Sequence, residues 1–153
     1  MPKLYLGVID QPYTNATYMP GSKKSTATTG MVAEWLENKY HVMEHFWQIY
    51  GEGSKAVIPG LLLKSLTRTV NTLLISGKAP RQINPFGTAT GEIEVLFKQM
   101  LDAKELDMLG YPGIPTKQAL IGYSNRFKRR RGPVRPSFID TGLYQASFKA
   151  WVD

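Results

Sequence analysis

The stretch RFKRRRGPVRPSFIDTGL, residues 126–143, changes character at its middle. Pro136 favours an extended backbone just before it, and the apolar pair Phe138 and Ile139 follows and is expected to pack inward. The next three residues predict a tight corner, because an Asp or Thr side chain caps a turn that glycine permits. The corner consists of Asp140, Thr141 and Gly142. The chain is therefore expected to turn back here into a final strand over 148–152.

The first half of this stretch is strongly basic and holds no acid. Its cations are Arg126, Lys128, Arg129, Arg130, Arg131 and Arg135. The chain has a net charge of +7, and outside this arm 13 basic residues face 12 acidic ones, so the basicity is local. One interpretation is a solvated loop. The other is a contact with nucleic-acid phosphates or with the acidic surface of an adjoining subunit.

Length and composition predict one globular domain over residues 1–153. Hydrophobic residues make up 42% and charged residues 20%, which is ordinary for a folded domain. The absence of cysteine excludes disulfides and thiolate metal sites. No apolar run approaches the ~18 residues of a membrane span, and the N-terminus does not resemble a signal peptide. We expect a soluble protein that is made in the cytoplasm and has no membrane partner.

Hydrophobic periodicity predicts a strand at each end and helices between them. A long loop over 10–30 separates the first strand from the first helix, and loops of this length are usually functional or disordered. The order favours an α+β fold in which a small sheet of the N- and C-terminal strands packs with three or four helices. The expected elements are a strand over 4–9, helices over 28–50, 59–75, 90–103 and 116–125, and the strand over 148–152.

Each helix is expected to bury the apolar side of its pattern. For the first helix this side is Val32, Trp35, Leu36, Met43, Phe46, Trp47 and Tyr50; for the second it is Leu62, Leu63, Leu66, Val70, Leu73 and Leu74. Glu94 and Lys98 predict an i,i+4 ion pair on the third helix. The carboxylates Asp102, Glu105 and Asp107 are interpreted as solvated surface.

His41, Glu44 and His45 match the H-x-x-E-H pattern of inverted zinc peptidases. Histidines four residues apart face one way on a helix, as chelation requires, and the glutamate could serve as a general base. No later segment offers a convincing third ligand, although Glu92 or Glu94 can be considered. Both histidines lie on the polar face of the expected helix, where solvation is the default, so we predict no metal site, no cofactor and no catalytic residue. A zinc peptidase is kept as the leading enzyme alternative.

The segment RPSFIDTGL, residues 135–143, with Ser147 four residues on, resembles a family of tailed-bacteriophage morphogenesis proteins. These are small neck, tail-completion and minor tail proteins. Leu6-Gly7-Val8-Ile9 resembles the opening strand of that family, and Val32-Ala33 the start of its first helix. Where the family often has a proline-rich segment before its middle helices, this chain has Tyr50-Gly51-Glu52-Gly53.

The resemblance implies a non-enzymatic virion subunit that forms a ring of six or twelve copies in the neck or tail, around a channel for DNA. The implied partners are further copies of the chain and neighbouring connector, tail terminator, tube or sheath proteins. The channel implied by the resemblance would also let the basic arm contact DNA. The loop over 10–30 and the arm over 126–136 are expected to reach neighbours, and the final strand is expected to pair with the edge of another subunit.

Three alternatives stay open at this point. A baseplate-proximal tail component or a tail assembly factor would have the same sequence features. A zinc-dependent peptidase would use His41, Glu44 and His45. A free DNA-binding protein would use the basic arm over 126–135.

Overall fold

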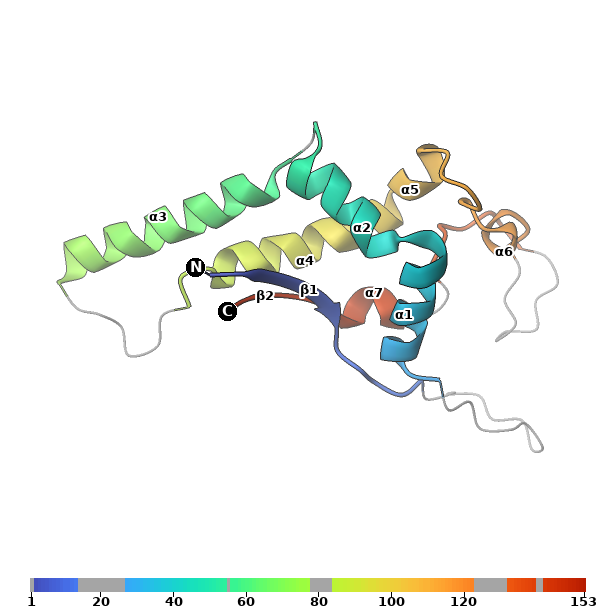
Figure 1. Ribbon diagram of the computed structural model, residues 1–153, viewed down its shortest axis with the longest axis horizontal. Helices are drawn as coiled ribbons and strands as arrows, with labels where there is room; N and C mark the ends of the chain where they lie inside the picture. The colour runs from blue at the N-terminus through green and yellow to red at the C-terminus, as the bar shows by residue number, and fades with distance from the viewer. Residues whose placement is uncertain (1, 14–26, 55, 78–83, 123–131, 140–141) are drawn as a thin grey trace.

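A two-stranded antiparallel sheet joins the two ends of the chain in the computed structural model (Figure 1). The structure describes residues 2–13, 27–54, 56–77, 84–122, 132–139 and 142–153. Strand β1 (Leu4–Val8) pairs with β2 (Phe148–Val152), with Leu4 opposite Val152 and Val8 opposite Phe148. The predicted sheet of N- and C-terminal strands is confirmed.

The two faces of this sheet differ in burial, as expected for a strand whose successive side chains point to opposite faces. Phe148 and Ala150 are buried, whereas Trp151 is exposed and stacks on Tyr5 at a ring-centroid distance of 5.7 Å. Helix α4 packs against β2. The inner face of the sheet therefore lies against this helix, and the outer face carries an aromatic pair.

Seven α-helices and one π-helical turn connect the strands in the described part of the chain. They are α1 (Thr29–Tyr40), α2 (Val42–Trp47), the π-helical turn η1 (Gln48–Glu52), α3 (Ile58–Ser76), α4 (Gly87–Asp102), α5 (Glu105–Met108), α6 (Lys117–Leu120) and α7 (Leu143–Ser147). The α+β class is confirmed, but there are more helices than predicted. Helices α5 and α7 have only four and five residues, too few for a periodic pattern to reveal.

The single helix predicted from Thr28 or Thr29 to Tyr50 is wrong, because the helix breaks at His41. Thr28 is the N-cap, as predicted, and its hydroxyl accepts a hydrogen bond from the Met31 N–H at 3.3 Å. His41 adopts a left-handed conformation with φ 50° and donates its N–H to the Glu37 carbonyl, which ends α1. Helix α2 then starts in a new direction (Figure 1).

The apolar stripe predicted along that helix is correct only in part. Leu36, Phe46 and Tyr50 are buried, whereas Trp35 is 54% exposed. A stripe drawn at a constant 3.6-residue period assumes a straight helix and loses its register at the break. The exposed Trp35 becomes part of a surface groove described below.

The core lies where α2, α4 and β2 meet. The rings of Phe97 and Phe148 stack at 3.9 Å, and Phe46 lies edge-on to both at 5.3 and 5.8 Å. All three side chains are fully buried. Aromatic rings favour these offset-stacked and edge-on arrangements, which add to the free energy gained by burying their area.

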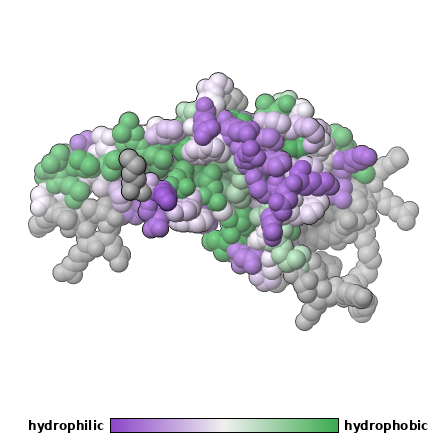
Figure 2. All heavy atoms as spheres, in the orientation of Figure 1, coloured by the Kyte–Doolittle hydropathy of each residue, from purple (hydrophilic) through white to green (hydrophobic). Residues whose placement is uncertain are grey.

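The two long helices α3 and α4 have bounds close to the predicted ones, but the predicted burial of the apolar side of α3 is wrong, because Leu63, Leu66, Val70 and Leu74 are exposed. Helix α3 ends at Gly77, which has φ 60° as a left-handed C-cap requires. The expected Glu94–Lys98 pair is replaced by a tertiary one, because Glu94 makes its ion pair with Lys149 of β2 at 2.8 Å. Glu94 therefore joins α4 to the sheet. Figure 2 shows hydrophobic residues on the surface along α3, a feature to which we return.

Other predicted segments are described in part. Pro12 and Thr28 form an isolated bridge at the two ends of the predicted 10–30 loop, whose residues 14–26 lie outside the described ranges. Thr116 caps α6 by accepting the Ala119 N–H at 3.2 Å, and this helix ends before the predicted residue 125. Over the ranges given above, none of the helices has both the length and the apolar character needed to cross a membrane.

Candidate functional site

The motif residues of the C-terminal stretch line an open groove of about 1170 Å³. One wall is α1, and the other consists of residues 112–119 together with 135–139. Among the predicted site residues, Arg135, Pro136 and Gly142 line this groove. Arg126, Lys128, Arg129, Arg130, Arg131, Asp140 and Thr141 lie outside the described residues.

The corner predicted at residues 140–142 rests on a left-handed glycine. Gly142 has φ 74°, where a side chain would be strained, and it is the N-cap of α7. Its carbonyl accepts the Ala146 N–H at 2.8 Å, which starts this helix. Helix α7 then leads directly into β2, so the corner sets the position of the final strand.

Arg135 holds the groove wall together. Its Nη1 donates to the Ile139 carbonyl at 2.6 Å, and its backbone N–H donates to the Ala119 carbonyl at 3.2 Å. The sequence predicted Arg135 as a contact residue of a cationic arm. Its hydrogen bonds also give it a structural role, fixing the 135–139 segment against α6, and the contact role stays a prediction.

Ser137 and Asp107 complete this wall, and the sequence interpretation missed both. The buried Ser137 hydroxyl accepts the Thr116 N–H at 3.0 Å, and the Ser137 N–H donates to Asp107 Oδ2 at 3.2 Å. Asp107 is therefore not merely solvated surface. The other two carboxylates read as surface are also bonded, Glu105 to the Tyr50 hydroxyl at 2.9 Å and Asp102 to the Gln145 amide at 3.0 Å.

Aromatic rings line both walls of the groove. Tyr40 lies edge-on to Trp35 at 5.7 Å and tilted against Phe138 at 5.2 Å. Lys39 Nζ lies 4.8 Å from the Trp35 ring and 5.0 Å from the Tyr40 ring, within the range of cation–π attraction. Phe138 has φ 67°, a conformation that costs an aromatic residue backbone energy and that no sequence signal predicts.

The charges that line the groove share one sign. Lys39, Lys117 and Arg135 are its charged residues among the described lining residues, which include no carboxylate. Tyr144 also lines the groove; it is 3% exposed, and its hydroxyl has no hydrogen-bond partner among the described residues. Burial, and next the charge of Glu37, raise the pKa of Tyr144. The groove therefore favours a ligand with negative charge and apolar side chains.

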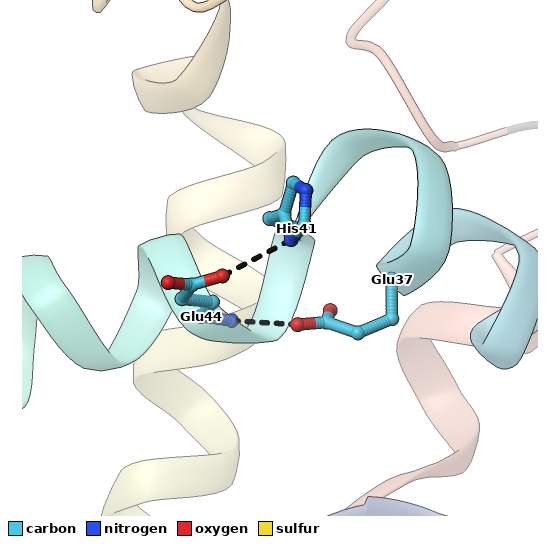
Figure 3. A group of neighbouring side chains, drawn as sticks. All are labelled: Glu37, His41 and Glu44. Atoms are coloured by element: carbon cyan, nitrogen blue, oxygen red, sulfur yellow. Dashed lines mark hydrogen bonds and ion pairs between the residues drawn. The ribbon is translucent and has the colours of Figure 1, made fainter.

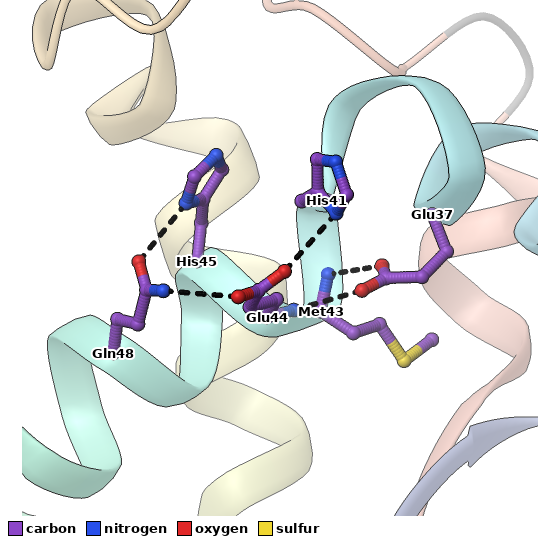
Figure 4. A network of polar contacts seen from close by, with 6 residues as sticks. All are labelled: Glu37, His41, Met43, Glu44, His45 and Gln48. Carbon is purple, nitrogen blue, oxygen red and sulfur yellow. Dashed lines mark hydrogen bonds and ion pairs between the residues drawn. The ribbon is translucent and has the colours of Figure 1, made fainter.

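The two histidines of the H-x-x-E-H pattern have separate neighbours. His41 Nδ1 lies 3.0 Å from Glu44 Oε2 (Figure 3). His45 Nδ1 lies 3.2 Å from Gln48 Oε1 (Figure 4). The His45 ring also stacks on Tyr111 at a centroid distance of 3.5 Å. The two rings lie edge-on to each other at a centroid distance of 6.3 Å, so the histidines face one way as predicted (Figure 4), although His41 caps α2 and does not lie within a continuous helix.

Among the described residues, one group of three possible metal ligands lies within 4.8 Å, and it excludes His45. It consists of Glu37, His41 and Glu44 (Figure 3). Both carboxylate oxygens of Glu37 already accept backbone N–H groups, Oε2 from Met43 at 2.7 Å and Oε1 from Glu44 at 3.1 Å. The cluster is accounted for as the cap of α2, whose first N–H groups have no partner within the helix.

Comparisons of the chain with protein-family models, with curated proteins and with solved structures give no match.

Proposed function

We propose that this chain is a structural subunit of a tailed-bacteriophage virion, which forms a ring in the neck or tail through contacts between subunits. The proposal joins the resemblance of residues 135–143 to the groove that these residues line. The groove carries the proposal because its described lining residues include three cations, several aromatic rings and neither histidine nor carboxylate. This chemistry suits the binding of a protein segment better than it suits a reaction.

The proposed contact places an acidic segment of a neighbouring subunit in the groove. Its carboxylates would lie near Lys39 and Lys117, and its apolar side chains against Trp35 and Phe138. A contact between two different surfaces of identical subunits closes a ring when the rotation between them is a simple fraction of a turn. Complementary charge would select the neighbour and speed its docking more than it would raise the affinity.

Light scattering at low and high protein concentration tests this proposal. We expect a mass of six or twelve times that of the 17.2 kDa chain. Lys117→Glu should reduce the assembled fraction, because it places an acid in the groove, and high salt should do the same. Lys64→Glu is the control, since it makes the same charge change on the exposed surface of α3.

Two results would contradict the proposal. The first is a constant mass of one chain at every concentration. The second is equal loss of assembly in Lys117→Glu and Lys64→Glu, which would attribute assembly to net charge alone.

DNA binding is the second candidate function, and the focal charge of the 126–135 arm favours it. A free DNA-binding protein would bind duplex DNA as a monomer, and its affinity would fall steeply with salt. Each phosphate-contacting arginine that is replaced by alanine should reduce the slope of log K against log salt by about 0.9. Salt-insensitive or absent binding would exclude this function.

A further inference from the structure

One side of α3 carries large apolar side chains that the rest of the described chain leaves exposed. Figure 1 shows α3 reaching away from the core at its C-terminal end, and Figure 2 shows hydrophobic residues on the surface there. Leu63 is 66% exposed, Leu66 is 40% exposed, Val70 is 43% exposed and Leu74 is 77% exposed. Exposed apolar groups that are contiguous on one element mark an interaction site more often than single ones do.

The side of α3 that faces α4 is a different one. Ile58 and Ser65 are its buried residues. The hydroxyls of Ser65 and Thr69 both donate to the Pro85 carbonyl, at 2.8 and 3.4 Å, just before α4 begins. The contact with α4 therefore uses one side of α3 and leaves the leucine-rich side without a described partner.

The exposed side has the spacing of a helix–helix seam. Leu63, Leu66, Val70 and Leu73 are separated by three, four and three residues. Alternating steps of three and four keep apolar residues on the line where two helices pack, with about 3.5 residues per turn. We call these four residues the α3 seam. The first three are exposed and Leu73 is half-buried.

The charges of α3 lie away from the seam. Lys64 and Arg68 are its only charged residues, and at 100° per residue each lies more than about 120° from the middle of the seam. The positions flanking the seam are Leu62, Thr67, Thr69 and Leu74. A second copy of α3 would therefore meet no like charge across the seam, whereas an acidic or basic partner would find no opposite charge.

The spacing between the seam residues is the same when read from either end of the helix. Steps of three, four and three are unchanged by reversal, so an antiparallel second copy places Leu66 opposite Val70 and Leu63 opposite Leu73. Antiparallel helices also align their macrodipoles favourably. A contact of this kind has two-fold symmetry, with the same surface on both subunits.

We propose that α3 of one copy packs antiparallel on α3 of a second copy, through the α3 seam and about a two-fold axis level with residue 68. The partner is thus a second copy of this chain. This contact is distinct from the groove contact, which joins unlike surfaces in a ring. If both exist, the α3 seam joins chains in pairs across two rings.

Val70→Glu and Asn71→Glu form the matched test. Both residues are exposed on adjacent positions of α3, so both variants should fold with unchanged circular dichroism. Val70→Glu places a charge in the seam and should raise the concentration at which chains pair by at least tenfold. Asn71→Glu, on the polar side, should change it less than twofold.

The mass measured by sedimentation or light scattering gives the result whether or not the chains also form rings. Wild type should form pairs or, if rings form, paired rings, and Val70→Glu should halve this mass. A wild-type mass of one chain or one ring at the highest soluble concentration would overturn the proposal. So would equal effects of the two substitutions. If no ring forms, the absolute masses change, but the comparison between Val70→Glu and Asn71→Glu stays the same. The ring proposal and the α3 proposal can therefore fail independently.

Cysteine cross-linking tests the orientation, because the chain has no cysteine of its own. Leu63→Cys and Leu73→Cys are prepared separately and treated with a short bifunctional maleimide. In the antiparallel pair the mixture cross-links, whereas either variant alone leaves its two thiols about 15 Å apart along the axis. Cross-linking within each variant alone would overturn the antiparallel arrangement.

Discussion

Thr29 shows how one side chain joins β1 to the first helix. It is fully buried, and its hydroxyl donates to the Ile9 carbonyl at 2.6 Å and accepts the Gln11 N–H at 2.8 Å. Both partners lie about twenty residues earlier, across the 10–30 loop. The sequence predicted Thr28 or Thr29 as a helix cap, but the second role of Thr29 depends on tertiary partners that no local pattern reveals.

Thr29→Val should lower the free energy of unfolding by roughly 1–3 kcal/mol, because it keeps the shape and leaves two backbone groups without a partner. Urea denaturation measures the loss. Thr72→Val is the matched control, since the exposed Thr72 hydroxyl bonds only the Arg68 carbonyl of its own helix and its loss should stay within about 0.5 kcal/mol. Equal losses in the two variants would remove the special role of Thr29.

At the scale of elements, the sequence predicts the long helices but does not predict the break between α1 and α2. Helices α3 and α4 follow a regular apolar period and were predicted with bounds close to the observed ones. The break has no glycine or proline to announce it. It depends on the Glu37 carboxylate of α1, which caps α2. This contact exists only in the folded chain, so no local sequence pattern predicts it.

The sequence likewise predicts some residues of the candidate groove and not others. Pro136 and Gly142 were predicted because proline and glycine leave a local signature, and Arg135 because it belongs to the basic run. Lys39, Trp35 and the backbone conformation of Phe138 were not predicted, because three segments distant in sequence build the groove. Similarly, periodicity found the apolar side of α3 but could not tell whether that side is buried in the domain or exposed on its surface.

Glycine substitutions at the two histidines should have opposite effects on stability. His41→Gly should raise the free energy of unfolding by about 1 kcal/mol, since glycine adopts positive φ without the cost a side chain meets there. His45→Gly should lower it by about 1 kcal/mol or more, because glycine weakens a helix interior and the stack on Tyr111 is lost. Thermal or urea denaturation compares them. A stabilising His45→Gly, or a His41→Gly that loses stability, would contradict the assignment of the break.

At the scale of the whole molecule, the terminal strands close the fold and the helices between them are joined by a few buried polar contacts. One of these contacts joins η1 to α5, where the Tyr50 hydroxyl donates to Glu105 Oε1 at 2.9 Å. Tyr50 is only 7% exposed. Burial first, and then the hydrogen bond to Glu105 and its negative charge, raise the pKa of Tyr50 to about 12.

This pKa predicts how Tyr50→Phe changes stability with pH. A tyrosine whose folded pKa is raised stabilises the fold fully below its unfolded pKa of about 10 and loses this contribution as pH rises toward 12. Near pH 7, Tyr50→Phe should therefore cost about 1 kcal/mol through the lost hydrogen bond. Above pH 10 the unfolded wild type ionises at Tyr50 and the variant does not, so the deficit of the variant should shrink. Other groups that titrate there, among them Tyr144, are common to both proteins and cancel in the difference. Urea denaturation of the two proteins between pH 7 and pH 11 measures it, and a difference that stays constant with pH would contradict the raised pKa and the Glu105 bond as its source.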